Sequence, residues 1–326
     1  LYFVLYKFVG VFGAGTVVDF VEGTLFGKYI NPAIASAVEK LVGSEAIRQL
    51  IMGDYGLVTL GLTYAIAIIL PVVGTFFLAF SVIEDSGYLP RLSLLIDRVF
   101  KKIGLSGRAV IPMVLGLGCD TMATIVTRTQ ETKRERVIAT LLLALAIPCS
   151  AQLGVIFALL APAPLALLTW VVVIIGNFMF VGFLASKIMP GQKPTFFMEL
   201  PPLRVPKASN VLSKTYTRIV WYLKEVLPLF IIASVVIWIL QITGAFPWIL
   251  KGLEPLVNAI GLPDQTSDVF FFGFFRRDYG AAGLFQMQDM LNANQLAISA
   301  VVLTLFVPCV AQLMVMFKER GAKTAL

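Results

Sequence analysis

The chain has 326 residues, of which 58% are hydrophobic and only 14% are charged. Roughly a quarter of the residues in a soluble domain are charged, so this composition excludes an ordinary soluble domain and predicts a polytopic membrane protein. The net charge of +7 comes from loops that flank apolar stretches, where membrane orientation already explains it, so we do not expect nucleic-acid binding.

Apolar stretches of about 20 residues, the length that crosses a bilayer, recur along the chain. They cover residues 1–18, 56–83, 137–161, 165–186, 226–250 and 293–317. Two further stretches, 106–127 and 268–291, are apolar but interrupted by Gly, Cys, Asp or Arg. We therefore expect an all-α membrane protein with about 6–8 transmembrane helices. Because the first stretch lacks an initiator Met and a signal-peptide pattern, we also expect the chain to begin within a longer polypeptide.

An internal repeat organises these stretches. Helix-punctuating residues share one offset of 157: Pro71 and Pro228, Gly87 and Gly244, Pro90 and Pro247, and Gly104 and Gly261. Further on the offset grows by three, so that Pro148-Cys149-Ser150-Ala151-Gln152-Leu153 matches Pro308-Cys309-Val310-Ala311-Gln312-Leu313. We divide the chain into an N-terminal helix with an external amphipathic segment (1–55), a first repeat (56–161), a linking helix with a cytoplasmic loop (162–219) and a second repeat (220–326).

Lysines and arginines indicate the orientation of the repeats. If 106–127 crossed the membrane fully, one of its two basic flanks would lie outside, against the positive-inside rule. A re-entrant or broken helical segment keeps both flanks and both termini cytoplasmic, and the matching segment of the second repeat then enters from outside. We therefore predict two inverted repeats, with a substrate site where their interrupted segments meet near the midplane.

The run Gly116-Leu117-Gly118-Cys119-Asp120-Thr121-Met122 places polar groups inside the first interrupted stretch. An acidic side chain in the hydrocarbon region is costly unless it is paired or hydrated, so Asp120 is a functional candidate, with Cys119 and Met122 as possible soft ligands and Gly116, Gly118 and Thr121 as supports. The alternative is that Cys119 only packs and that Asp120 caps a helix starting at Thr121.

The two hexapeptides each place a thiol beside a proline. Pro148 and Pro308 each remove a backbone hydrogen bond and release the carbonyl one turn earlier, and a carbonyl and a thiol both suit a cation. Cys149 and Cys309 are therefore candidate metal ligands, with Ser150, Gln152 and Gln312 as supports. The alternative for each hexapeptide alone is simple packing. Three cysteines in apolar stretches do not form a disulfide framework.

Two charged runs need separate explanations. Arg276-Arg277-Asp278 lies in the second interrupted stretch, where arginines must find carboxylates or carbonyls. We expect an ion-paired structural lock there rather than direct cation contact, because arginine repels cations. Glu84 and Asp85 end the first long helix, either as a cation vestibule or as a solvated helix end. Histidine is absent and no phosphate-binding loop or catalytic set occurs, so we do not expect an enzyme.

Several runs together resemble one family. They are Glu84-Asp85-Ser86-Gly87-Tyr88, Gly116-Leu117-Gly118-Cys119, Thr127-Arg128-Thr129, Arg134-Glu135-Arg136, Pro148-Cys149-Ser150-Ala151-Gln152, Leu200-Pro201-Pro202 and Arg276-Arg277-Asp278-Tyr279-Gly280. The chain resembles, over nearly its whole length, the membrane domain of the bacterial ferrous iron transport protein B (FeoB) family.

This resemblance implies Fe²⁺ uptake across the bacterial inner membrane through two Gate units, coupled to GTP and Mg²⁺ by a cytoplasmic G domain that this chain lacks. By position Cys119 matches the first Gate cysteine, Cys149 the second, and Cys309 is the counterpart of Cys149. The partners it implies are membrane lipid, the G domain, small accessory iron-transport proteins and, as a further candidate, a second copy of the chain.

Two departures from the family pattern bear on the metal. Cys119-Asp120-Thr121-Met122-Ala123 stands where the family usually continues Cys-Asn-Val-Pro-Ala, and Pro148-Cys149 with Gln152 stands where it usually has Ser-Cys and a nearby Arg. The site is then less positive and richer in cation ligands, or has a different metal preference. Two other readings stay open: a Gate-type permease for nucleosides or another divalent metal, and a non-transporting subunit that docks a G domain.

The predicted orientation can be tested with single cysteines introduced at Lys133 and Ala163 in a cysteine-free background. Impermeant thiol reagents should reach position 133 only from the cytoplasmic side and position 163 only from the outside, because one hydrophobic span separates them. Labelling of both positions from the same side would contradict the inverted topology.

Overall fold

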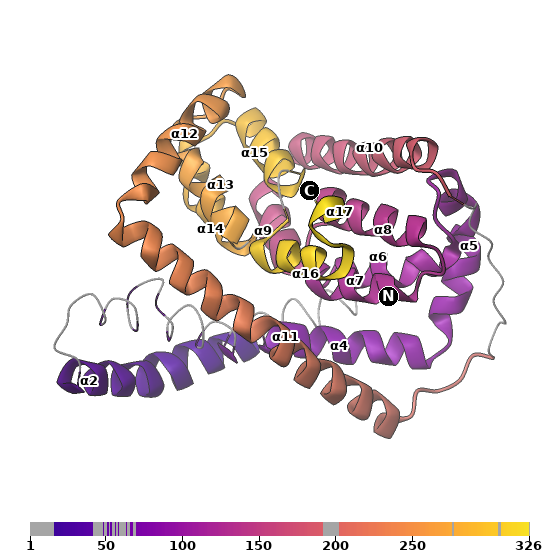
Figure 1. Cartoon of the computed structure of the whole chain (residues 1–326), viewed down its shortest axis with the longest axis horizontal. Coiled ribbons are helices and arrows are strands. Elements are labelled where there is room, and N and C mark those ends of the chain that lie inside the picture. The colour runs from indigo at the N-terminus through magenta and orange to yellow at the C-terminus, as the bar shows by residue number, and fades with distance from the viewer. Residues whose placement is uncertain are drawn as a thin grey trace. The chain divides into compact units, whose positions relative to one another are not determined.

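The computed structural model describes residues 16–41, 70–191, 202–275, 277–305 and 308–325, with a few single positions between 48 and 67 (Figure 1). Every regular element within these ranges is a helix, which confirms the all-α prediction. The chain divides into two compact units, the first formed by Leu1–Ser86 and Val205–Ile249 and the second by Gly87–Arg204 and Leu250–Leu326.

The first unit contains η2 (Asp19–Ile30), α2 (Asn31–Leu41), α4 (Leu70–Asp85) and α11 (Ala208–Ile242). Helix α4 packs against α11 and buries Phe77 and Phe80, which are 1% and 2% exposed. The predicted stretch 1–18 lies almost entirely outside the described residues. The predicted span 226–250 overlaps α11, a 35-residue helix that begins at Ala208 and continues through Pro228; its crossing of a membrane stays a prediction.

The second unit holds the remaining helices. They are α5 (Tyr88–Lys102), η4 (Gly107–Ala109), α6 (Val110–Gly116), α7 (Asp120–Val126), η5 (Thr127–Thr129), α8 (Lys133–Ala146), α9 (Ser150–Leu160), α10 (Pro164–Ile188), α13 (Thr266–Phe275), α14 (Arg277–Gln286), η6 (Gln288–Met290), α15 (Ala293–Leu305), α16 (Val310–Arg320) and α17 (Ala322–Ala325). Helix α12 (Ala245–Ala259) crosses the boundary between the units in sequence.

The repeated glycines occupy the same backbone conformation in both halves of the chain. Gly87 and Gly244 have φ angles of 77° and 68°, and Gly104 and Gly261 have φ angles of 78° and 84°. Glycine adopts this left-handed region without a Cβ penalty, so each glycine can end one helix and turn the chain. The helices between them, α5 and α12, are both 15 residues long. The sequence repeat is therefore also a repeat of local structure.

Both interrupted stretches are pairs of short helices. In the first, α6 and α7 pack against each other around the break at 117–119. In the second, α13 and α14 run antiparallel, because a Cβ on Gly280 would lie 2.7 Å from the Cα of Gly273 and one on Gly283 would lie 3.2 Å from Val269. Their position relative to a membrane stays a prediction.

The core of the second unit forms between the two repeats and the linking helix. Trp170 of α10 is buried against α9, α14 and α15, in a cluster that includes Ile156, Leu284 and Ala300. Its indole Nε1 donates to the hydroxyl of Thr304 at 3.2 Å, which satisfies the only polar atom of the ring. These contacts hold α9 beside α14, and both helices carry candidate site residues.

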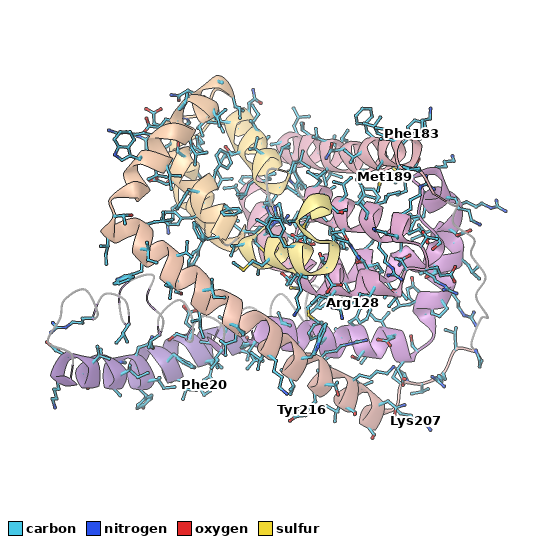
Figure 2. The ribbon with its side chains drawn as sticks, in the orientation of Figure 1. Phe20, Arg128, Phe183, Met189, Lys207 and Tyr216 are labelled. Atoms are coloured by element: carbon cyan, nitrogen blue, oxygen red, sulfur yellow. The ribbon has the colours of Figure 1, made fainter. Side chains whose placement is uncertain are left out.

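Two stretches among the described residues are long and apolar enough to cross a bilayer, α10 and the stretch Ala293–Arg320 that contains α15 and α16. The outward side chains of α10, including Leu165, Leu168 and Phe183, are exposed, as Phe183 shows in Figure 2. Exposed apolar residues in a row are expected where a helix faces lipid. The larger number of spans predicted from hydropathy stays a prediction.

The close approach of α13 and α14 can be tested by Gly280→Ala. The new methyl group would meet the Cα of Gly273 and the carbonyl oxygen of Val269 at under 3 Å, so we expect a loss of about 1–3 kcal/mol in stability and a lower melting temperature in detergent. Gly154→Ala is the matched control, because nothing lies within 4 Å of that site in α9. An unchanged melting temperature for Gly280→Ala would contradict the tight pairing.

Candidate functional site

The three cysteines occupy equivalent positions at the ends of broken helices. Cys119, Cys149 and Cys309 are the N-cap residues of α7, α9 and α16, and each has an extended backbone. Pro148 and Pro308 lack the N–H that would continue the preceding helix, and Gly118 precedes the third break. Each thiol therefore lies beside the exposed N–H groups of a helix N-terminus.

The strongest interaction at these breaks is an ion pair between two buried side chains. Nη1 of Arg277, the first residue of α14, lies 2.5 Å from Oδ2 of Asp120, the first residue of α7. The two side chains are 3% and 2% exposed. The alternative in which Asp120 caps its own helix is not what the structure shows, because α7 begins at Asp120 and no side-chain capping bond is present at its N-cap, Cys119.

Arg277 also binds the break between α8 and α9. Its Nη1 donates to the carbonyl oxygen of Ile147 and its Nη2 to that of Ala144, both at 2.9 Å. The carbonyl of Ala144 is the one that Pro148 releases, since a proline has no N–H to donate to the residue four positions earlier. The released carbonyl predicted from the first hexapeptide is therefore present, and the cation bound to it is a guanidinium.

The ion pair leaves polar atoms unused on both sides. Oδ1 of Asp120 and Nε of Arg277 are buried and have no hydrogen-bond partner among the described residues. Only glycine fits at position 116 beside the carboxylate, because a Cβ there would lie 3.2 Å from Oδ1 of Asp120 and 2.6 Å from Leu143. A buried carboxylate with only one oxygen bonded retains capacity for another ligand.

The thiols of Cys119 and Cys309 lie in the same region as Asp120. Both thiols interact electrostatically with Asp120 and with each other, and the thiol of Cys309 lies beside the side chain of Thr121. Cys149 is half-buried, and the neighbouring Ser150 hydroxyl donates to the carbonyl oxygen of Gly118 at 3.1 Å. The hexapeptide of the first repeat therefore contacts the break that carries Cys119.

Gln152 and Gln312 are equivalent residues one turn into α9 and α16 and are completely buried. Neither side-chain amide has a hydrogen-bond partner among the described residues. Met122 is also buried, at 3% exposure. Two buried amides without partners are unusual, because each costs free energy unless a ligand or water satisfies it.

The predicted metal ligands do not form a preformed metal centre. Within the described ranges, no three Cys, Asp or Glu side chains gather in an arrangement that could hold a metal ion. Cys119, Asp120 and Cys309 are brought into one region, with Cys149 at a neighbouring break. The carbonyl of Ala144 was predicted from Pro148, four positions later. The contribution of Ile147 was not predicted, because a main-chain carbonyl has no residue-type signature.

The other charged candidates have different surroundings. In the first unit, Glu84 pairs with Arg218 at 2.6 Å and with Lys214 at 3.4 Å, and Asp85 accepts from the backbone N–H of Lys207 at 3.0 Å. These carboxylates join α4 to the start of α11. This arrangement favours neither a cation vestibule nor a solvated helix end, the two interpretations given above. Arg276 and the side chain of Asp278 lie outside the described residues.

Two family models match the chain. The Gate model, described as nucleoside recognition, matches residues 66–163 and 223–323, and the model of the ferrous iron transport protein B C terminus matches residues 167–218. No solved structure matches. Two Gate matches joined by one match to the ferrous iron transport protein B C terminus cover most of the chain. The chain belongs to the ferrous iron transport protein B family.

Relatives with curated names agree with this family. The Fe(2+) transporter FeoB of Methanocaldococcus jannaschii is 28% identical over 300 residues, which cover 80% of this chain and 45% of the relative. FeoB of Staphylococcus aureus strain COL is 32% identical over 186 residues, 55% of this chain and 28% of the relative. A Fe(2+) transport protein A/FeoB fusion protein of Porphyromonas gingivalis is 29% identical over 215 residues, 64% of this chain and 25% of the relative. The chain spans less than half the length of these relatives.

The energetic role of the ion pair can be tested by Asp120→Ala. This change leaves the Arg277 guanidinium buried without its carboxylate, so we expect a loss of about 3–5 kcal/mol in stability, measured by thermal unfolding in detergent. The double variant Asp120→Ala/Arg277→Met should recover most of the loss, because it replaces both charges by apolar groups.

Asp289→Ala is the matched control for this series, because Asp289 is exposed in η6. Its melting temperature should equal that of the wild type. A melting temperature of Asp120→Ala equal to that of Asp289→Ala would show that the buried pair does not stabilise the fold.

Proposed function

We propose that this chain forms the ion-translocating part of a ferrous iron transporter and carries Fe²⁺ across the cytoplasmic membrane. The observation that carries the proposal is the meeting of Cys119, Cys309 and Asp120 at helix breaks in a chain of the FeoB family. The relatives named as Fe(2+) transporters support the same cargo.

The donor set suits a borderline divalent ion. Fe²⁺ accepts thiolate, carboxylate and carbonyl ligands, whereas Mg²⁺ prefers oxygen alone. A path must let its ion leave, so donors spread along several helix breaks serve transport better than a closed cage. The absence of a three-residue metal centre within the described ranges agrees with a path of weak, successive contacts.

We further propose that α6–α7 and α13–α14 are re-entrant pairs that enter the membrane from opposite sides, as inverted repeats. The Asp120–Arg277 bond supports this arrangement, because it joins the turning point of one pair to the turning point of the other. Non-helical backbone at membrane depth is tolerated only where protein or a water-filled cavity covers it. The breaks are therefore the expected places for the ion path.

Coupling to GTP belongs to this proposal as well. A cytoplasmic G domain would supply GTP and Mg²⁺ binding, since the chain has no phosphate-binding loop of its own. The Porphyromonas gingivalis relative is named as a fusion with Fe(2+) transport protein A, which supports a small accessory protein as a partner.

A second candidate, nucleoside transport, is favoured by one observation. Gln152 and Gln312 present four buried amide atoms without partners among the described residues, and an amide offers both the donor and the acceptor that the edge of a base requires. In a proteoliposome assay, an excess of uridine or adenosine should leave Fe²⁺ uptake unchanged if iron is the cargo. Uptake of labelled nucleoside, lost in Gln152→Leu, would favour this candidate instead.

The thiol path can be tested by Cys119→Ser in the full-length protein, with anaerobic Fe²⁺ uptake into proteoliposomes as the measurement. A hydroxyl ionises far less readily than a thiol and is a poorer ligand for Fe²⁺, so uptake should fall by on the order of ten-fold. Met290→Leu, which removes an exposed sulfur from η6, should transport normally. Wild-type uptake by Cys119→Ser would remove this thiol from the mechanism.

A further inference from the structure

Arg277 and Asp120 stand at equivalent positions of the two repeats. They are 157 residues apart, the offset that also relates the paired glycines, and each is the first residue of the second helix in its interrupted stretch. Two equivalent turning points therefore meet with opposite charges. The thiol of Cys309 interacts electrostatically with both Arg277 and Asp120, and the thiol of Cys119 interacts with Asp120.

The groups around the guanidinium are of the types that also bind inorganic cations. They are one carboxylate oxygen and two main-chain carbonyl oxygens, from Asp120, Ala144 and Ile147, all within 2.9 Å of the Arg277 nitrogens. The Ala144 carbonyl is exposed by Pro148 and the Ile147 carbonyl lies after the end of α8. Carboxylate and carbonyl oxygens are common ligands of divalent cations.

The ion pair does not have the form of a purely structural lock. Such a lock would use both carboxylate oxygens in a bidentate bond, which is the stronger and more specific geometry. Here Oδ1 of Asp120 and Nε of Arg277 are both buried without a hydrogen-bond partner in the described part of the chain. Gly116 lies next to Oδ1, since a Cβ on this residue would lie 3.2 Å from that oxygen. Oδ1 therefore keeps its capacity to bind a cation when the guanidinium leaves Oδ2.

We propose that Asp120, Ala144 and Ile147 form a cation site of the path and that Arg277 is a tethered cation that fills this site until a divalent ion displaces it. The inference rests on the proposed transport of Fe²⁺, and it makes Arg277 the side chain that closes the ion path between transport events. A doubly charged ion attracts the carboxylate more strongly than a guanidinium does, because Coulomb energy scales with charge. When the ion leaves, Arg277 returns and keeps the buried carboxylate paired, so the empty path is closed to other cations.

The test compares anaerobic Fe²⁺ binding to the purified full-length protein by titration calorimetry. Arg277→Gln removes the competing charge, so the Kd for Fe²⁺ should fall by roughly ten-fold or more relative to the wild type. Asp120→Asn/Arg277→Gln should lose this gain, because the carboxylate is gone. Arg277→Lys keeps a charge without the planar fork and should give an intermediate Kd.

Arg108→Gln is the matched control, because it removes an arginine paired with Glu131 in the same unit. Its Kd should equal that of the wild type. A folded Arg277→Gln protein with the wild-type Kd would overturn the proposal and leave Arg277 as a structural lock.

A melting curve covers the case in which Arg277→Gln folds poorly. The unpaired carboxylate should lower its melting temperature, and Fe²⁺ should raise it again by binding the folded state. No rise with Fe²⁺ would overturn the proposal. Failure of the wild type to transport Fe²⁺ would instead contradict the proposed function. The comparison of Fe²⁺ binding among the Arg277 variants would still decide whether the cation site exists.

Discussion

A carboxylate and a guanidinium that are both withdrawn from solvent constrain every segment around them, since neither charge is tolerated there alone. Asp120 and Arg277 are held in this way, and the second contact of Arg277 with the carbonyls of Ala144 and Ile147 adds the end of α8. Three separate helix breaks therefore meet at one side chain. The irregular backbone that would otherwise be costly in an apolar setting has its partners supplied by this arginine.

Much of the fold could be predicted because its signals are local. Hydropathy predicted an all-α chain, and glycines marked helix ends: Gly87, Gly104, Gly244 and Gly261 are left-handed at the positions that the repeat relates. The extent of α11 was not predicted, because residues 208–225 mix polar and β-branched residues of middling helix propensity and carry no clear apolar run. The inversion of the repeats was inferred from loop charge at the level of sequence and stays a prediction.

The site was predictable in its residue types and not in its contacts. Asp120 and the arginines could be identified from sequence because they are charged residues within apolar stretches. Pro148 predicted a released carbonyl. That the cation on this carbonyl would be Arg277 depends on tertiary packing, which brings α14 beside α9. Glu84 had two open readings because the basic partners of a helix end, here on α11, lie more than a hundred residues away in sequence.

The opposite charges at the two equivalent turning points have a consequence for how such a chain can be assembled. If two copies of the first repeat were paired in the same way, two carboxylates would face each other at the meeting point, and two copies of the second would bring two guanidiniums together. Either homodimer would bury like charges, at a cost that the surrounding contacts could not offset. Only the unlike halves are electrically compatible, so the duplication, once diverged at this position, requires one copy of each repeat.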